Sequence, residues 1–414
     1  MLKNLLLLFA STSLLLACQS SKKDQNVLTA ETGAWLMKMR LDEAVLPFNF
    51  HLEEKSGDYL IRITNADEEI LITEVNAFKD SIQFDMPVYE SAFFLKVHNA
   101  DSMSGKWVNY YKSDDYQIAV RAKRTDQARF GEMSNRKDST PLLFSKYAVV
   151  FSPGQENSYQ AIGLFEAEGE TVKGTFATET GDYRYLEGRL VNDSLFLSTF
   201  DGSHAFYFAA KVKDSTLKGV FVSGIHHREL WEGINNPTFK LSNPDSLTSL
   251  VDSAEVNFEL PNSEGQKVSL GDSVFENKVK IIQIMGSWCP NCLDESRYFN
   301  ALHKKYSDSG LAIIGVAFER TRSENRALQN LSRLVAKENL HYPLLLGGYN
   351  RDHHPRKVFP MIDRIISYPT SLFLDKANKV RKIHTGFYGP GTGSYYKEYK
   401  AETELFIESL LRED

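Results

Sequence analysis

Two cysteines, Cys289 and Cys292, stand three residues apart in the segment Trp288-Cys-Pro-Asn-Cys292. An apolar run at 279–285 predicts a buried strand before them, and helical spacing over 293–306 predicts a helix after them. The first turn of a helix has unpaired N–H groups and a partial positive charge, which stabilise a thiolate, the attacking form of cysteine. Two sulfurs at this spacing can also close a disulfide. The pattern predicts a redox-active dithiol in which Cys289 attacks and Cys292 resolves.

The cysteine count supports redox chemistry over a structural role. The 414 residues contain three cysteines, and the third, Cys18, lies near the N-terminus. A disulfide between Cys289 and Cys292 closes too short a loop to restrict the unfolded chain much, so it would add little stability. Reversible oxidation of the pair explains the motif better.

A zinc site that joins the two cysteines to histidine ligands is the alternative. The candidates are two adjacent pairs, His226-His227 and His353-His354. Adjacent residues on a strand point to opposite faces, and neither pair stands at ligand spacing from the cysteines. We therefore expect no metal, and no cofactor other than the redox-active disulfide itself.

The elements that would position the dithiol alternate between strand and helix over residues 256–414. Their expected order is β-α-β-α-β-β-α, preceded by a small hairpin within 258–270, which indicates an α/β domain. The further strands are expected at 311–317, 342–346, 371–374 and 380–385, and the further helices at 322–338 and 398–411.

Residues 31–245 read as a β-rich domain. Short segments of alternating polarity recur about every ten residues, separated by Gly/Asp/Asn/Ser turns, which predicts an up-and-down meander closed as a barrel or folded as a sandwich. Trp35, Trp107 and Trp231 would either fill its core or line a binding site. Residues 246–255 are rich in Ser and Asp and are expected to be a linker.

Residues 1–18 have the features of an export signal: a positive Lys3, an apolar run of signal-peptide length, and the ending Leu15-Leu-Ala-Cys18. This ending resembles the lipobox of bacterial lipoproteins, which implies a lipid on Cys18, a polar tether over 19–30 and attachment to a membrane. Gln19 after the cysteine favours the outer membrane under the sorting rules of such lipoproteins. The alternative is an ordinary secretory signal. Both readings predict an exported protein, and the lipid-anchored one predicts a cell-envelope protein that faces the periplasm.

Residues 256–414 resemble the thioredoxin-like disulfide reductases of the bacterial envelope, the TlpA/ResA-type family. The matching motifs are Trp288-Cys-Pro-Asn-Cys292, Tyr368-Pro-Thr370, Asp375-Lys376 and Ile383-His-Thr-Gly-Phe387. The resemblance implies a thioredoxin-like fold and a cis peptide bond between Tyr368 and Pro369, where main-chain groups would pair with an extended client. An ordinary trans proline in an edge turn is the alternative. Trp288, Pro290 and Asn291 would complete the client-binding surface.

Glu295 also fits the family pattern, three residues after Cys292. On a helix this spacing directs it back toward Cys292, where a carboxylate could accept a proton from the thiol or raise the pKa of that thiol. A solvated glutamate on the helix surface is the alternative. Gln283 departs from thioredoxins proper, which carry a buried Asp at this place, so the usual proton acceptor is missing.

These features predict an enzyme that reduces or isomerises protein disulfides, with thiol or disulfide proteins as substrates and an upstream electron donor as partner. A thiol peroxidase is one alternative, although Gly286 stands where such enzymes carry Thr or Ser. A binding lipoprotein whose β domain captures a ligand is another. The net charge of −6 gives no basic field, so nucleic acid is excluded as a partner.

Overall fold

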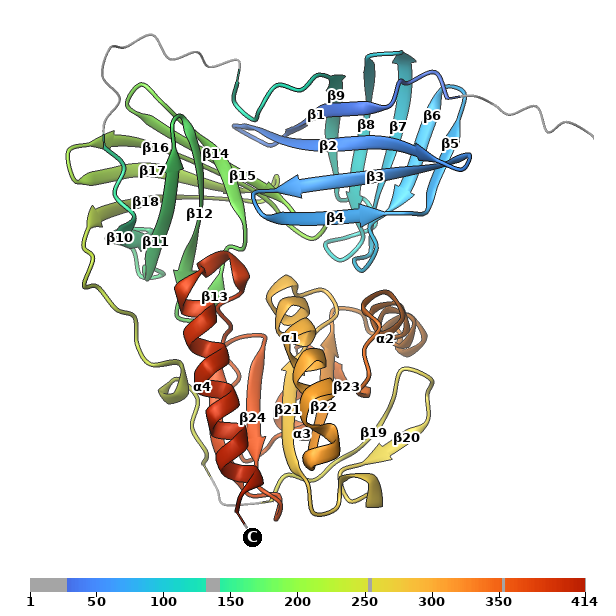
Figure 1. Ribbon diagram of the computed structural model, residues 1–414, viewed down its shortest axis with the longest axis vertical. Helices are drawn as coiled ribbons and strands as arrows, with labels where there is room; N and C mark the ends of the chain where they lie inside the picture. The colour runs from blue at the N-terminus through green and yellow to red at the C-terminus, as the bar shows by residue number, and fades with distance from the viewer. Residues whose placement is uncertain (1–27, 132–141, 252–254, 352–353, 414) are drawn as a thin grey trace, which may run out of the picture.

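The computed structural model describes residues 28–131, 142–251, 255–351 and 354–413. Two β sheets lie side by side at one end, and an α/β domain lies at the other end (Figure 1). The expectation of an all-β region followed by an α/β domain is confirmed. The all-β region, however, is divided into two sheets, whereas the sequence suggested one meander.

The first sheet has nine strands in the order β4-β3-β2-β1-β9-β8-β7-β6-β5, so that β4 and β5 are its edges. Buried and exposed residues alternate along its strands, most regularly in β9, because successive side chains of a strand point to opposite faces. The strands are β1 (Gly33–Arg40), β2 (Val45–Lys55), β3 (Asp58–Asn65), β4 (Glu68–Ile72), β5 (Val75–Phe78), β6 (Ser81–Asp85), β7 (Ser91–Asn99), β8 (Ser102–Asn109) and β9 (Gln117–Arg124).

The second sheet closes into a barrel, because β11 pairs with β12 as well as with β10. Its buried aromatic residues pack against one another, which identifies Trp231 as a core residue. The short strand β13 pairs only with the end of β12 and lies outside the closed ring. The strands are β10 (Lys146–Phe151), β11 (Tyr159–Glu168), β12 (Thr171–Thr178), β13 (Gly181–Asp182), β14 (Leu186–Val191), β15 (Ser194–Phe200), β16 (Ala205–Lys213), β17 (Thr216–Ser223) and β18 (His227–Asn235).

The two sheets share a core at the end of β15. Phe200 of the second sheet stacks on Phe48 of the first, with 4.8 Å between ring centroids. The buried Arg129 donates hydrogen bonds to the carbonyl oxygen of Ser198 at 2.9 Å and to Oδ1 of Asn65 at 3.0 Å. Since these contacts join both sheets, the all-β region behaves as one packed unit.

The α/β domain contains a five-stranded sheet in the order β23-β22-β21-β24-β25. Strands β21 and β22 are buried along their whole length, as expected for parallel strands covered on both faces. A two-stranded hairpin precedes this sheet. The elements are β19 (Glu259–Pro261), β20 (Lys267–Ser269), β21 (Val279–Met285), α1 (Pro290–Tyr306), β22 (Leu311–Glu319), α2 (Glu324–Glu338), β23 (Leu344–Tyr349), α3 (His354–Val358), β24 (Thr370–Leu374), β25 (Val380–Thr385) and α4 (Ser394–Leu411).

The stretch expected as a linker, residues 246–255, is partly bound to the α/β domain. Thr385 donates a hydrogen bond to the hydroxyl of Thr248 at 2.7 Å, and Leu250 forms an isolated β bridge with Ile362. The physical boundary of the domain therefore lies before these contacts, nearer residue 243.

None of the helices in the described residues is long and apolar enough to cross a membrane. The export signal with Cys18 and most of the polar tether lie outside the described residues, and so does His353.

Candidate active site

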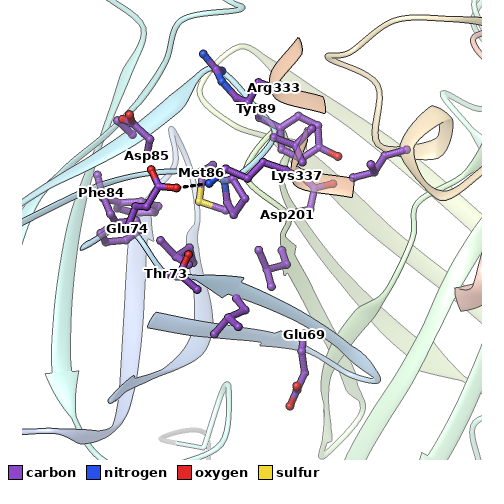
Figure 2. A pocket seen from close by; sticks show the side chains of 18 of the residues that line it. Glu69, Thr73, Glu74, Phe84, Asp85, Met86, Tyr89, Asp201, Arg333 and Lys337 are labelled. Atoms are coloured by element: carbon purple, nitrogen blue, oxygen red, sulfur yellow. Dashed lines mark hydrogen bonds and ion pairs between the residues drawn. The ribbon is translucent and has the colours of Figure 1, made fainter. Parts of the chain in front are cut away.

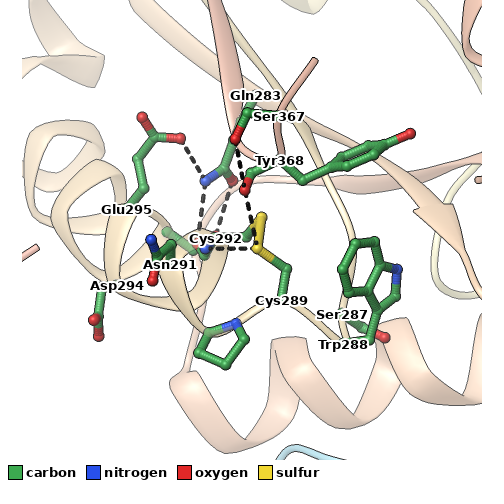
Figure 3. The surroundings of a disulfide bond; sticks show 12 residues. Gln283, Ser287, Trp288, Cys289, Asn291, Cys292, Asp294, Glu295, Ser367 and Tyr368 are labelled. Carbon is green, nitrogen blue, oxygen red and sulfur yellow. Dashed lines mark hydrogen bonds between the residues drawn. A yellow bond between two sulfur atoms is a disulfide. The ribbon is translucent and has the colours of Figure 1, made fainter. Parts of the chain in front are cut away.

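The dithiol lies at the junction of β21 and α1, as the sequence predicts. A disulfide joins Cys289 and Cys292, whose Cα atoms are 5.2 Å apart (Figure 3). Cys289 is the N-cap of α1, and its sulfur accepts a hydrogen bond from the amide of Cys292 at 3.2 Å. Pro290 occupies the first position of the helix, where no N–H is needed. In the reduced state this amide would stabilise a thiolate on Cys289.

The peptide bond between Tyr368 and Pro369 is cis, as the resemblance implied. Its loop lies against the dithiol, because Sγ of Cys289 is 3.4 Å from the carbonyl oxygen of Tyr368. The Tyr368 ring packs edge-on against Trp288, with 5.5 Å between centroids, and the guanidinium of Arg320 lies 3.8 Å from the centre of the Trp288 ring. An aromatic wall with a cation on it therefore borders the dithiol.

Glu295 is fully buried, so the alternative of a solvated residue on the helix surface does not hold. Its carboxylate accepts hydrogen bonds from Gln283 at 2.9 Å, Ser371 at 3.0 Å and Tyr399 at 3.0 Å. The Gln283 amide also donates to the carbonyl oxygen of Cys292 at 3.2 Å (Figure 3). Glu295 is therefore linked to Cys292 through Gln283.

Burial raises the pKa of Glu295 to about 7, because the protein interior solvates its ionised form poorly. The three hydrogen bonds act in the opposite direction, since they favour the carboxylate. The group therefore changes its charge near neutral pH. A negative charge there disfavours a thiolate on the buried Cys292.

A second buried carboxylate, Glu319, was not predicted from the sequence. It accepts hydrogen bonds from the amide of Ser287 at 2.8 Å and from its hydroxyl at 2.7 Å, directly before the dithiol motif. Burial raises its pKa to about 6. The sequence feature that could have revealed Glu319 is its position at the end of an otherwise apolar strand, because a buried acidic residue there needs hydrogen-bond donors.

Side chains of the β region also contact the dithiol motif. Arg184 donates a hydrogen bond to the carbonyl oxygen of Pro290 at 2.8 Å, and Ser203 donates to that of Trp288 at 3.1 Å. The Asn291 amide donates to the carbonyl oxygen of Asp182 at 3.2 Å. No local sequence signal marks these residues, because the contacts span about a hundred positions of the chain.

The histidines considered as zinc ligands do not join the cysteines in the described part of the chain. His226 lies in the β region, with Nδ1 3.0 Å from the hydroxyl of Tyr116 and Nε2 3.1 Å from Nζ of Lys112. Among the described residues, no group of three or more His, Cys, Asp or Glu side chains is arranged to hold a metal ion.

Comparison with known proteins identifies the α/β domain. A model of the AhpC/TSA family matches residues 251–383. The thioredoxin-like protein YneN of Bacillus subtilis is 28% identical over 131 residues, which cover 31% of this chain and 68% of YneN. The thiol-disulfide oxidoreductase ResA of Bacillus thuringiensis is 30% identical over 124 residues, which cover 30% of this chain and 63% of that protein. The α/β domain is similar to these thioredoxin-like proteins, and we call it the ResA-type domain.

The chain is also similar to solved structures. A thiol:disulfide interchange protein of the thioredoxin family from Chlorobium tepidum is 20% identical with a TM-score of 0.30, and the match covers 39% of this chain and 99% of that protein. The chain spans less than two thirds of the length of the matching ResA protein. The match to the family model lies wholly within the C-terminal part of the chain.

Proposed function

We propose that this protein is a thiol–disulfide oxidoreductase of the cell envelope that reduces or isomerises the disulfides of protein clients. The Cys289–Cys292 disulfide at the N-terminus of α1 carries this proposal, because the Cys292 amide is directed at Sγ of Cys289. The names of the relatives indicate the same chemistry.

The proposed reaction starts from the reduced dithiol. The Cys289 thiolate attacks one sulfur of a client disulfide, a mixed disulfide forms, and the other client sulfur leaves as a thiolate. Cys292 then loses its proton and attacks Sγ of Cys289, which releases the second client thiolate. The client gains two electrons and the dithiol becomes the disulfide. An upstream dithiol donor is then needed to reduce it again.

The two cysteines divide these roles because their environments differ. Cys289 caps a helix and receives the Cys292 amide, and both effects favour its thiolate. Cys292 is fully buried, with Glu295 behind it across Gln283, so its thiolate is disfavoured until the mixed disulfide forms. We assign Glu295 as a positioning residue, which acts through Gln283 and controls the ionisation of the Cys292 thiol.

Replacing each cysteine separately tests the mechanism. Cys292→Ser should leave the attack intact and block resolution, so that mixed disulfides with clients accumulate through Cys289. Cys289→Ser should trap none. Non-reducing gels of envelope extracts, followed by sequencing of the trapped species, would measure this and name the clients. Equal trapping by both variants would contradict the assignment.

Peroxide consumption separates this proposal from the peroxidase alternative. The matched family model carries the AhpC/TSA description, so the full-length protein should also be assayed with hydrogen peroxide. We expect insulin disulfides to be reduced and peroxide to be consumed slowly. Fast peroxide consumption that Cys289→Ser abolishes would instead indicate a peroxidase.

The cellular location remains part of the proposal. We propose that Cys18 carries lipid and anchors the mature chain to a membrane. Gln19 favours the outer membrane. We also propose that the dithiol faces the periplasm. The support is the lipobox-like ending at Cys18. Mass spectrometry of the mature N-terminus tests it, because an unmodified terminus, or one that starts elsewhere, would contradict the lipid anchor.

A further inference from the structure

A segment of the second sheet, residues 178–185, covers the surface on which a client would pair with the dithiol. Ser367, next to Tyr368, donates a hydrogen bond from its hydroxyl to the carbonyl oxygen of Thr180 at 2.7 Å. The Thr180 backbone also lies on Gly386, because a Cβ at Gly386 would come within 2.8 Å of the Thr180 carbonyl carbon. A stretch of this chain thus runs beside the cis-proline loop.

The same segment contacts the dithiol motif and the loop after β25. The carbonyl oxygen of Asp182 accepts a hydrogen bond from the Asn291 side chain at 3.2 Å, and its carboxylate accepts one from the amide of Gly389 at 2.5 Å. Arg184 donates to the carbonyl oxygen of Pro290 at 2.8 Å. Residues 178–185 therefore occupy polar groups on both sides of the dithiol.

The dithiol beside these contacts is buried. Cys289 is 6% exposed and Cys292 is 0% exposed. Attack on a client requires a foreign disulfide to reach Sγ of Cys289, and the segment occupies groups with which such a client would pair. Thr180 is exposed to solvent, so the segment lies at the surface of the molecule.

Residues 179–182 can be displaced without opening the barrel. Ring closure depends on the pairing of β12 with β11 and with β14. Strand β13 contributes two residue pairs, both with the end of β12. The Tyr183 ring, by contrast, packs against Phe176, Phe208 and Phe221 of the barrel core and stays with the barrel. Displacement of residues 179–182 therefore breaks a local turn only.

The surroundings of Arg184 are loosely packed. A cavity of about 750 Å3 lies between the first sheet and the ResA-type domain, and Arg184 is among the residues that line it. Figure 2 shows Tyr89 and Asp201 at this cavity. Among the described residues, neither the buried Tyr89 hydroxyl nor Nε of Arg184 has a hydrogen-bond partner. A second cavity, of about 360 Å3, borders residues 178–183 and Asn291. The interface on both sides of the segment therefore has room for movement.

Arg184 is the main electrostatic link that keeps the segment in place. Its guanidinium pairs with Asp294 of α1 at 2.7 Å and with Glu68 of the first sheet, and Nε lies 3.7 Å from Asp201. All four side chains are buried. Because a buried carboxylate needs a partner, loss of Arg184 would favour separation of the segment from α1.

We propose that residues 179–182 are a resident occupant of the client surface, kept there by the neighbouring Arg184, and that an extended segment of a protein client replaces them before Cys289 attacks. This inference rests on the proposed function. The client segment supplies the groups that this chain supplies in the closed state. These are carbonyl oxygens that accept from Ser367 and Asn291, a small residue against Gly386, and a carboxylate that accepts from the Gly389 amide. The surface therefore favours extended, acidic polypeptide over small neutral disulfides.

Access to Cys289 tests this directly. In the Cys292→Ser background, the reduced protein is alkylated with iodoacetamide, which is small, and with a maleimide attached to a long polyethylene glycol chain. Mass spectrometry of the Cys289 peptide follows both rates. We expect Arg184→Met and Asp182→Ala to speed the bulky reagent about tenfold or more, and the small reagent far less, because each removes charged hydrogen bonds of the closed state.

Arg326→Met is the matched control. Arg326 also joins the β region to the ResA-type domain, because it donates hydrogen bonds to Glu90 at 2.7 Å and to the carbonyl oxygen of Tyr110 at 3.3 Å. This contact does not involve residues 178–185. The Arg326→Met variant should therefore leave the ratio of the two alkylation rates unchanged. If Arg184→Met fails to fold by circular dichroism, Asp182→Ala decides the result.

The ratio of rates also separates this inference from the proposed function. If the bulky reagent reacts as fast as the small one in the parent protein, or if both folded variants keep the parent ratio, the segment is no cover and the inference is overturned. If the ratio shifts while the parent protein with both cysteines intact fails to reduce insulin, the cover stands and the proposed function fails.

Discussion

Several carboxyl groups lie near the start of α1, and burial raises the pKa of Glu295, Glu319 and Asp182 among them. The pKa is about 7 for Glu295, about 6 for Glu319 and about 6 for Asp182. Each accepts hydrogen bonds that favour its ionised form without cancelling the effect of burial. At the scale of single residues, the charge around the dithiol therefore changes between mildly acidic and neutral pH.

Glu295→Gln tests this through the pH dependence of stability. The pKa of Glu295 is higher in the folded chain than the ordinary 4.5, so the native state binds more protons and its free energy of unfolding falls as pH rises from about 4.5 to 7. In the variant this decrease should be absent. The free energy of unfolding that it removes over this pH range is at most on the order of 3 kcal/mol. Urea unfolding at several pH values measures it. Glu402→Gln, on the exposed face of α4, is the control, and parallel curves for Glu295→Gln and the parent protein would contradict the prediction.

At the scale of elements, the turn between β21 and α1 determines where the dithiol sits. Glu319 holds that turn from the end of the neighbouring strand β22, through two hydrogen bonds to Ser287. The parallel pairing of β21 with β22 brings the two ends together. The carboxylate therefore anchors the residues immediately before the helix.

Glu319→Ala should destabilise the ResA-type domain by about 2–4 kcal/mol, because it leaves the Ser287 amide and hydroxyl without their acceptor and opens a small cavity. Glu319→Gln keeps one acceptor oxygen and should lose less. Denaturant unfolding of both variants checks the order. An alanine variant as stable as the glutamine variant would show that the turn does not depend on this carboxylate.

Phe200 is the corresponding anchor between the two sheets. It is fully buried and stacks on Phe48 across the boundary. Phe200→Ala should lower the stability of the β region by about 3–5 kcal/mol, as large-to-small changes in packed cores do. Phe78→Ala, at a side chain that is 48% exposed, should change it by about 0.5 kcal/mol or less. Similar losses in both variants, measured by denaturant unfolding, would show that the sheets do not share a core.

At the scale of the whole molecule, the β region closes over the N-terminal end of α1 (Figure 1). In the ResA-type domain, the core on one face of the sheet consists of residues of that domain alone, whereas the core on the other face is continuous with that of the first sheet. The ResA-type domain should therefore fold without the β region, although its dithiol would then be uncovered.

Two fragments test this. Residues 243–414 retain the hydrogen bonds of Asp245 with His384 and of Thr248 with Thr385, whereas residues 252–414 lack them. Both should fold, and the shorter should be less stable by about 1–3 kcal/mol, since two hydrogen bonds are lost. Circular dichroism during thermal unfolding measures the difference. An insoluble or unfolded longer fragment would show that the β region is integral to the domain.

The sequence by itself determined the parts of this protein that depend on neighbours along the chain. A helix begins directly after Cys289, and a buried strand ends at Met285, shortly before it. Spacing and polarity were therefore enough to place the dithiol and the alternation of the β strands, whereas the cis proline came from the resemblance to a family. The burial of Glu295 was left open, because a helix position alone does not say which face is covered.

Only the tertiary structure decided how the β strands divide into two sheets and what covers the active site. The pairing of β11 with β12 closes a barrel, and Arg184 reaches α1 across 106 positions of the chain. Such contacts depend on how separately folded units pack, which local propensity and periodicity do not encode. The dithiol could therefore be found from the sequence, while its cover could be seen only in three dimensions.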